Sequence, residues 1–208
     1  MAETLPEPPA PPAPTAADAA AAVAAGPVRL RGWNLSDLEL RDLDLSRCVF
    51  AACRAPRADF AKSDLTEAAF DGCDLNNSRW GRAMLTEARF SDCRLTGADF
   101  TDVRGVDLRF ERCLLIGARL RGRDFRGLVL KGLDFQDADL EGADFREAVL
   151  EGCSLRSAAL ARARFEGADL RGCDLGGLDL ADAARFRGAT ISKAQAAQLL
   201  GQVGLRVV

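Results

Sequence analysis

A five-residue register constrains this chain more than any other feature of its sequence. Every fifth residue from Leu35 to Leu180 falls on a large apolar position, and 28 of these 30 positions hold Leu, Phe or Trp. The two exceptions are Ala55 and Gly105. A period of five matches neither the 3.6 residues of an α-helix nor the two of a regular strand. The register therefore indicates an internal structural repeat.

The residues around each large apolar position repeat as well. The words ADLEG at 138–142 and ADFRE at 143–147 show the pattern: a small residue, a polar one, Leu or Phe, then two polar or turn-forming residues. Such words suit short extended pieces that turn a corner every five residues, with the large and the small residue facing inward. Glycine often occupies the corner, where positive φ is tolerated.

This pattern resembles that of the pentapeptide repeat family over about three quarters of the chain. The resemblance implies an all-β solenoid, a right-handed quadrilateral β-helix in which four words make one coil. An independent observation agrees with twenty residues per coil, because six of the seven cysteines share that period. They are Cys53, Cys73, Cys93, Cys113, Cys153 and Cys173.

The cysteines fall on the small inward position, which favours a structural role. The chain has no histidine and no Cys-x-x-Cys pair, so it offers a poor zinc site. A catalytic thiol needs an exposed, electropositive setting. We therefore interpret the cysteines as small buried hydrophobic residues and predict no disulfide, no metal and no cofactor.

Three parts follow from the register. Residues 1–27 hold seven of the eight prolines and an alanine-rich run, and predict a disordered tail, with a transient helix over residues 16–25 as the alternative. Residues 28–183 predict the β-helix. Residues 184–208 leave the register and predict a short C-terminal helix and strand that form a cap and dimer module, because Ser192 and Gln195 fit a capping box.

Two places within the repeat are expected to disturb it. Pro56, beside Ala55, cannot donate a hydrogen bond to a ladder. Gly105 leaves a large apolar position empty. We predict local irregularities in coil stacking at both.

Bulk properties exclude several function classes. The net charge of −3 gives no basic footprint for nucleic acid, and no apolar run is long enough to cross a bilayer. The N-terminal residues lack the Lys or Arg of a secretory signal, so we expect a cytoplasmic protein. Without histidine, tyrosine or a phosphate-binding loop, the usual catalytic constellations are missing, and we predict no enzyme and no catalytic residue.

The C-terminal segment sharpens the resemblance. Residues 186–191, with the pairs at 195–196, 199–200 and 204–205 and Val207, resemble the C-terminal end of the quinolone-resistance, DNA gyrase-protecting members. The uninterrupted register is similar to their loopless branch. The resemblance implies a DNA-mimicking protein that binds DNA gyrase or another type II topoisomerase and protects it from poisons such as quinolones or a self-made gyrase-targeting antibiotic. It also implies a homodimer through the C-terminus. The expected interface residues are Ala196, Leu199, Leu200, Val203, Leu205 and Val207.

One wall of the expected coil is the candidate partner-binding face. Its outward positions hold nine acidic residues against five basic ones, a net charge of −4. The acidic residues are Asp44, Asp64, Glu67, Glu87, Asp107, Asp124, Asp144, Glu147 and Glu166. The alternative interpretation is a mixed, soluble surface on a non-catalytic, rod-like interaction scaffold with an unknown partner.

Overall fold

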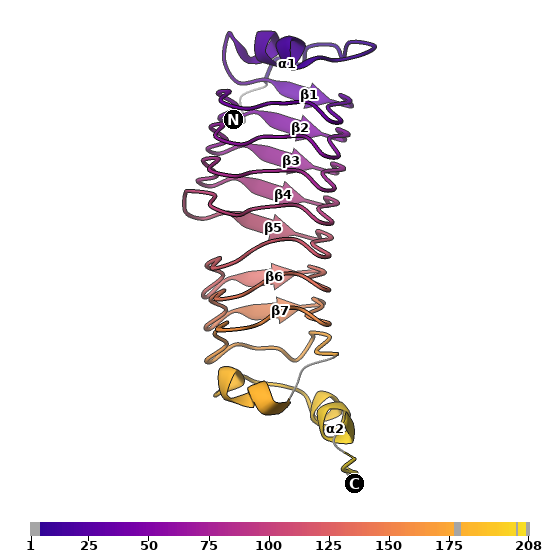
Figure 1. Ribbon diagram of the computed structural model, residues 1–208, viewed down its shortest axis with the longest axis vertical. Helices are drawn as coiled ribbons and strands as arrows, with labels where there is room; N and C mark the ends of the chain where they lie inside the picture. The colour runs from indigo at the N-terminus through magenta and orange to yellow at the C-terminus, as the bar shows by residue number, and fades with distance from the viewer. Residues whose placement is uncertain (1–4, 177–179, 203, 207–208) are drawn as a thin grey trace. The chain divides into compact units, whose positions relative to one another are not determined.

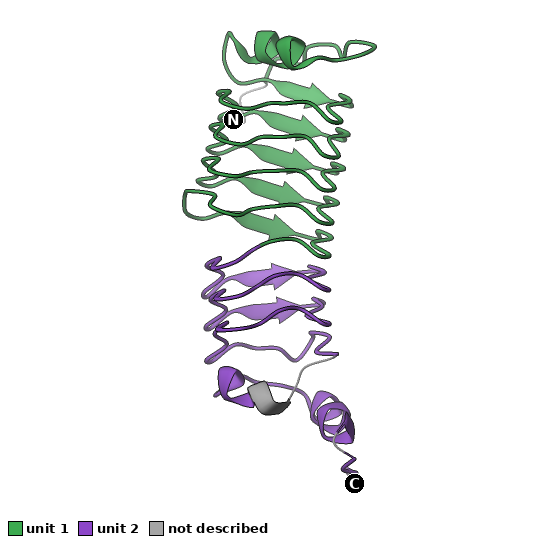
Figure 2. Ribbon diagram, in the orientation of Figure 1, with its two compact units in different colours: residues 1–119 green, residues 120–208 purple. Residues whose placement is uncertain are grey.

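The computed structural model describes residues 5–176, 180–202 and 204–206 (Figure 1). The chain divides into two compact units, residues 1–119 (unit 1) and residues 120–208 (unit 2), which Figure 2 distinguishes by colour. Each unit contains coils in which residues twenty apart pair in parallel. The predicted right-handed quadrilateral β-helix is confirmed.

One wall of unit 1 is a five-stranded parallel sheet. Its strands follow the chain order β1 (Arg29–Arg31), β2 (Val49–Ala51), β3 (Ala69–Asp71), β4 (Arg89–Ser91) and β5 (Arg109–Glu111). The other walls pair through single bridges with the same spacing, as Asp44 with Asp64.

Unit 2 repeats this arrangement and then ends in helices. Strands β6 (Val129–Lys131) and β7 (Val149–Glu151) pair in parallel. After the last coil come the 3₁₀-helix η1 (Leu180–Phe186) and the helix α2 (Lys193–Gln202). The coil-to-coil pairing extends to Thr190, which bridges to Asp169.

The large apolar residues stack inside the coils. Phe50 and Phe70 have ring centroids 4.5 Å apart and planes 4° apart, and Phe60 stacks on Trp80 at 4.4 Å. The two columns meet edge to face, as Phe70 and Trp80 do at 90°. These distances are close to the spacing of adjacent strands, so the backbone ladder and the ring stacks share one repeat.

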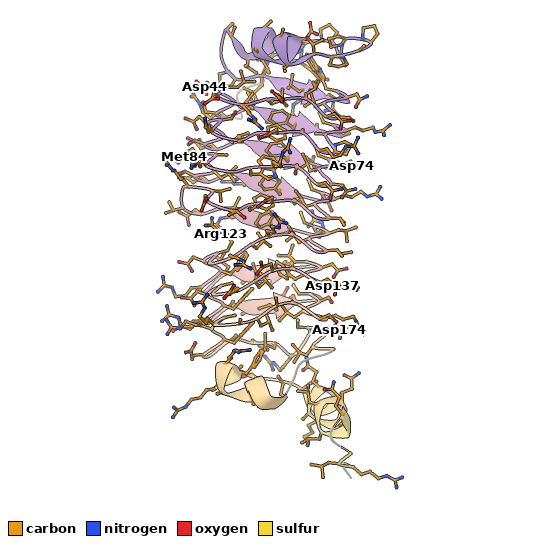
Figure 3. All side chains as sticks on the ribbon, viewed as in Figure 1. Asp44, Asp74, Met84, Arg123, Asp137 and Asp174 are labelled. Carbon is orange, nitrogen blue, oxygen red and sulfur yellow. The ribbon has the colours of Figure 1, made fainter. Side chains whose placement is uncertain are left out.

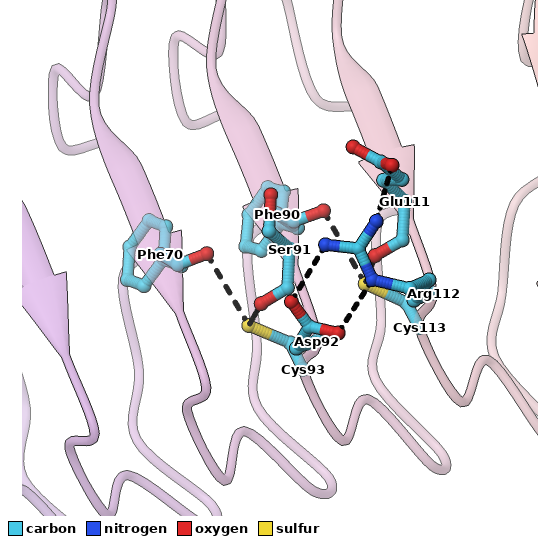
Figure 4. Close-up of polar contacts among 8 residues, drawn as sticks. All are labelled: Phe70, Phe90, Ser91, Asp92, Cys93, Glu111, Arg112 and Cys113. Atoms are coloured by element: carbon cyan, nitrogen blue, oxygen red, sulfur yellow. Dashed lines mark hydrogen bonds and ion pairs between the residues drawn. The ribbon is translucent and has the colours of Figure 1, made fainter. Parts of the chain in front are cut away.

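The cysteines form a buried ladder beside these rings. All seven are buried and free. The Cys93 Sγ donates to the carbonyl oxygen of Phe70 at 3.4 Å, and the Cys113 Sγ donates to that of Phe90 at 3.3 Å (Figure 4). Burial raises the pKa of the Cys153 thiol. The predicted burial is confirmed, and the thiols act as packing groups. Five of them also donate to a carbonyl oxygen of the preceding coil: Cys53, Cys73, Cys93, Cys113 and Cys153.

The segment before the first coil differs from the expected disordered tail. Helix α1 (Ala16–Val23) begins with a capping box between Thr15 and Asp18. Upstream of α1, the carbonyl oxygen of Pro6 accepts a hydrogen bond from the Arg29 amide at 2.8 Å. Proline favours an extended backbone and keeps its carbonyl as an acceptor, so the proline-rich segment can cover the open edge of the first coil.

Helix α2 is fastened to the last coil by one side chain. Gln195 completes the predicted capping box, accepting from the Ser192 amide at 2.7 Å. Its Nε2 donates to the carbonyl oxygens of Leu170 at 2.6 Å and Cys173 at 2.7 Å. The predicted C-terminal helix is therefore present, and it satisfies carbonyl groups at the end of the β-helix.

The predicted irregularity at Pro56 is wrong. The Ala55 amide still donates to Asp74 at 2.7 Å, and the Pro56 carbonyl accepts from the Asp37 amide at 3.0 Å. At the equivalent position of another wall, the Ala61 amide donates locally to the Asp59 side chain. Proline is tolerated because this position does not use its N–H in the coil-to-coil ladder.

The predicted irregularity at Gly105 is confirmed. Its φ is +106°, and a Cβ there would lie 2.5 Å from the Thr86 amide nitrogen. The next residue, Val106, is 66% exposed, and the chain leaves the outline of the neighbouring coils just before β5 (Figure 1). Even so, the Val106 carbonyl accepts from the Glu87 amide at 2.9 Å, so pairing with the previous coil survives.

Candidate functional site

The candidate site is the acidic face, which is described in each unit by itself. In unit 1 it comprises the outward residues around Leu45, Leu65, Leu85 and Gly105, and in unit 2 those around Phe125, Phe145 and Phe165. The structure turns all nine predicted carboxylates outward; eight are exposed and Asp144 is half-buried. In Figure 3, Asp44 and Met84 lie along one edge of unit 1, and Asp74 lies at the other.

In unit 1 the carboxylates of the acidic face form no ion pair with the residues that the structure describes. Glu67, Glu87 and Asp107 occupy corners with φ values of 58°, 56° and 58°. Because corners of successive coils stack, these three side chains form a row at the coil spacing of about 4.8 Å. Asp44 and Asp64 lie opposite each other in adjacent coils. None of the five makes an ion pair with a residue in the described part of the chain.

Hydrogen bonds from Ser46 and Thr66 hold two of these carboxylates without neutralising them. The Ser46 Oγ and amide donate to Asp44 at 2.6 and 3.0 Å, and these bonds lower the pKa of Asp44. Asp64 accepts a hydrogen bond from the Thr66 backbone amide at 2.9 Å. Both side chains are thereby oriented, and their charges stay exposed.

In unit 2 the acidic face is largely neutralised by its own arginines. Arg126 pairs with Asp124 at 3.2 Å. Arg146 pairs with Asp144 and holds the pKa of that carboxyl down to about 2. Glu166 pairs with Arg164 at 3.6 Å. Of the four acidic residues, only Glu147 makes no ion pair with a described residue.

The charge of the acidic face is therefore concentrated in unit 1. That part has five acidic residues and two basic ones, Arg47 and Arg104, so five minus two gives net −3. The part in unit 2 has four acidic and three basic residues, so four minus three gives net −1. The predicted set of nine carboxylates is not one uniform surface.

Two exposed apolar residues lie among the carboxylates of unit 1, and the sequence analysis did not identify them. Met84 is 36% exposed and Val106 is 66% exposed. They come from adjacent coils, since Arg104 bridges to Met84. The sequence signal that could have identified them is an apolar residue at an outward position that holds a polar residue in most of the five-residue words.

A carboxylate on another wall has a structural role. Asp59 is only 2% exposed and pairs with Arg41 at 2.5 Å and with Arg79 at 3.1 Å. Burial opposes its ionisation, and its hydrogen bonds with Arg41 and the Ala61 amide outweigh burial, so its pKa is lowered. The residue ties three coils together and does not present its charge to solvent.

The residues of the predicted dimer interface divide into different environments. Leu199 is only 8% exposed, whereas Leu205 is 57% exposed. Ala196 and Leu200 are half-buried. Val203 and Val207 lie outside the described residues. Leu199 is therefore packed within a single chain, and Leu205 is the most exposed of the described members of this set.

The described ranges contain neither a metal-binding cluster nor a membrane-spanning helix. No cluster of three or more Cys, Asp or Glu side chains there is arranged to hold a metal ion. None of the helices in those ranges has the length and apolar composition needed to span a bilayer.

Family models match most of the chain. A model described as "Pentapeptide repeat region" matches residues 28–100, and one described as "Pentapeptide repeats (8 copies)" matches residues 109–146 and 138–177. The chain belongs to the pentapeptide repeat family. No curated protein sequence gave a match.

Solved pentapeptide repeat structures share the fold. A trypsin-treated form of QnrB1, a plasmid-mediated fluoroquinolone resistance protein, has a TM-score of 0.77 at 22% identity, covering 87% of this chain and 90% of QnrB1. Full-length QnrB1 has a TM-score of 0.64 at 21% identity, covering 85% of this chain and all of the other. At such identities the likeness establishes the β-helical fold of this pentapeptide repeat protein.

Proposed function

We propose that this pentapeptide repeat protein is a non-catalytic, cytoplasmic partner of DNA gyrase, or of another type II topoisomerase, and that it protects the enzyme from poisons such as quinolones. The observation that carries the proposal is the set of outward, unpaired carboxylates on the acidic face of unit 1. The fold shared with QnrB1, a fluoroquinolone resistance protein, supports the choice of partner.

The carboxylates would act as selected contacts and not as a full image of a phosphate backbone. Four coils, from Asp44 to Asp107, cover about 14 Å at the strand spacing. Duplex DNA carries roughly eight phosphate charges over that length. The acidic face of unit 1 has net −3, so DNA mimicry here depends on where the carboxylates sit. Exposed charges of this kind are screened by salt, and binding should weaken as ionic strength rises.

We extend the proposal to a homodimer formed through the C-terminal segment. Leu205 is 57% exposed and Ile191 is 36% exposed, and both belong to the part of the chain that follows the last coil. A two-fold interface uses the same patch on both copies, so each exposed apolar residue is buried twice. Leu199 remains in the packing of one chain, and the proposed contact uses Leu200 and Leu205.

The test is DNA supercoiling by gyrase in the presence of a fluoroquinolone, with and without the protein. We expect the protein to restore supercoiling and to reduce the amount of drug-stabilised cleaved DNA. A triple variant, Glu67→Gln with Glu87→Gln and Asp107→Asn, should lose this protection.

The matched control neutralises three other exposed carboxylates of unit 1 that form no ion pair with described residues: Asp42→Asn with Asp71→Asn and Asp102→Asn. It should protect as well as the unmodified protein. If the unmodified protein neither binds gyrase nor changes drug-stabilised cleavage, the proposal is wrong, and an interaction scaffold for a different partner is the better interpretation.

A further inference from the structure

Two arginines stand directly opposite each other beside the acidic face. Arg89 on β4 pairs in register with Arg109 on β5, and both side chains are exposed. Like charges directly opposite each other in a sheet are destabilising. Neither guanidinium forms an ion pair with any residue that the structure describes. The two positive charges are therefore left uncompensated on the outer surface of unit 1.

This arginine pair lies next to the row of carboxylates. Glu87 and Asp107 precede Arg89 and Arg109 by two residues in their coils. All four line one open hollow of about 540 Å³. The remaining lining residues are Phe90, Ser91, Phe110 and Glu111. The hollow thus runs between a negative row and a positive row, and neither row neutralises the other through an ion pair.

Another wall of unit 1 shows that the fold can compensate neighbouring charges. There Arg79 pairs with Asp59 at 3.1 Å, and Arg119 pairs with Asp99 at 3.0 Å. Each pair joins adjacent coils with opposite charges at the same outward position. The rows around the hollow have the contrary arrangement, with like charges stacked and opposite charges side by side.

We propose that the partner in the proposed function docks across both rows, so that Arg89 and Arg109 bind carboxylates of the partner while Glu67, Glu87 and Asp107 bind its Lys or Arg side chains. This inference rests on the proposed function and deepens it. The coil spacing of about 4.8 Å is close to the 5–6 Å that separates side chains three or four residues apart on a helix. The surface therefore fits a partner helix with a basic row beside an acidic row.

The arginine row distinguishes the proposed two-row contact from a contact that only imitates DNA. A phosphate backbone presents only negative charge. A partner site that recognises nothing but phosphate-like groups would bind more tightly if the arginines became acidic. A site with carboxylates opposite the arginines would bind more weakly, because two attractive pairs would become repulsive.

The experiment is charge reversal of the row, Arg89→Glu with Arg109→Glu, measured by gyrase affinity and by protection of gyrase from a fluoroquinolone. We expect at least a tenfold loss of affinity and a matching loss of protection. The neutral pair, Arg89→Gln with Arg109→Gln, should show an intermediate loss. Far-ultraviolet circular dichroism and melting temperature establish that each variant is folded.

The matched control makes the same charge change on a different wall of unit 1. Arg54 and Arg94 are exposed, form no ion pair with described residues and flank Asp74, which Figure 3 places at the edge away from Asp44 and Met84. The control pair, Arg54→Glu with Arg94→Glu, should bind gyrase within twofold of the unmodified protein.

The outcomes distinguish this inference from the function on which it rests. If the unmodified protein protects gyrase and the reversed row binds equally well or more tightly, the two-row contact is wrong and the proposed function stands. Equal losses in the reversed row and in the control would also overturn it, because net charge alone would then account for binding. If the unmodified protein does not bind gyrase, both proposals fail.

Discussion

In both units the acidic face contains aspartates that accept a hydrogen bond from the amide two residues later, but the residue at that position differs between the units. In unit 1, Ser46 and Thr66 follow Asp44 and Asp64 by two positions and donate hydrogen bonds to them. In unit 2, Arg126 takes this position after Asp124 and forms an ion pair with it. A hydroxyl residue orients the carboxylate and leaves its charge available, whereas arginine cancels it. The identity of this one residue therefore decides whether the aspartate before it can attract a cationic partner or is already neutralised within the chain.

Exchanging this residue should remove the difference between the two units. Ser46→Arg with Thr66→Arg would give Asp44 and Asp64 their own arginines. Two lost attractions at a protein interface amount to about 3 kcal/mol, which corresponds to roughly a hundredfold weaker binding of gyrase. The equivalent change on another wall, Ser36→Arg with Thr96→Arg, serves as the control. Unchanged affinity in the first variant would show that the free carboxylates of unit 1 are not the contact.

A second comparison concerns structural carboxylates in the two units. Asp59→Asn in unit 1 removes a charge that is 2% exposed and shared by two arginines, so we expect a loss of about 2 kcal/mol in the free energy of unfolding. In unit 2, the Asp139 side chain is 24% exposed and pairs with Arg121. Asp139→Asn should therefore lower the free energy of unfolding by only about 0.5 kcal/mol. Chemical denaturation measures both, and equal losses would contradict this ranking.

A third comparison uses two glycines of the acidic face. Gly105→Ala in unit 1 places a Cβ 2.5 Å from the Thr86 amide nitrogen at a φ of +106°, and should destabilise the protein by about 2 kcal/mol. Gly127→Ala in unit 2 adds a Cβ into open space at a φ of +66°, and should cost about 1 kcal/mol. Thermal melting checks the order. A Gly105 variant as stable as the Gly127 variant would mean that the chain relaxes there.

The last expected effect is a dependence of stability on acid pH that arises from one ion pair in unit 2. Arg146 lowers the pKa of Asp144 from 3.8 to about 2. A carboxyl with a lowered pKa in the folded state stabilises the fold above its unfolded pKa and loses that contribution as pH falls through its folded pKa. The Asp144 carboxyl alone should therefore contribute a fall of at most about 2 kcal/mol in the free energy of unfolding between about pH 4 and pH 2. In Arg146→Gln, denaturation curves should show a smaller fall over this interval.

The inward-facing half of this molecule was predictable because each contribution to it is periodic. A five-residue register identifies Phe50 and Phe70 as core residues, and a twenty-residue register stacks them. The exceptions to the register depend on individual hydrogen bonds, which residue periodicity does not specify. Pro56 is tolerated because its position makes no use of an N–H, and this becomes visible only when the hydrogen bonds are traced.

The ends and the surface were less predictable. Prolines before Thr15 give the same composition signal whether the segment is disordered or pairs with a coil, as Pro6 does with Arg29. The nine carboxylates could be assigned to one wall, but their ion pairs depend on side-chain geometry, and so the contrast between Asp64 and Asp144 was not predicted. The twenty-residue spacing of Arg89 and Arg109 predicts that they lie opposite each other. The net charge of their wall gave no indication of this pair, because its acidic and basic residues balance.

The assignment of four words to each coil limits how such a chain can change length. Deleting one word of five residues would keep every large apolar side chain inside, because the inward positions recur with that period. If the deletion lay between Asp44 and Asp64, it would also rotate everything that follows by a quarter turn, and Asp64 would no longer lie opposite Asp44. Only gain or loss of twenty residues preserves both the interior and the outer pattern. Length variation that retains the binding surface is therefore expected in whole coils, whereas a five-residue change would give a stable protein with its surface scrambled.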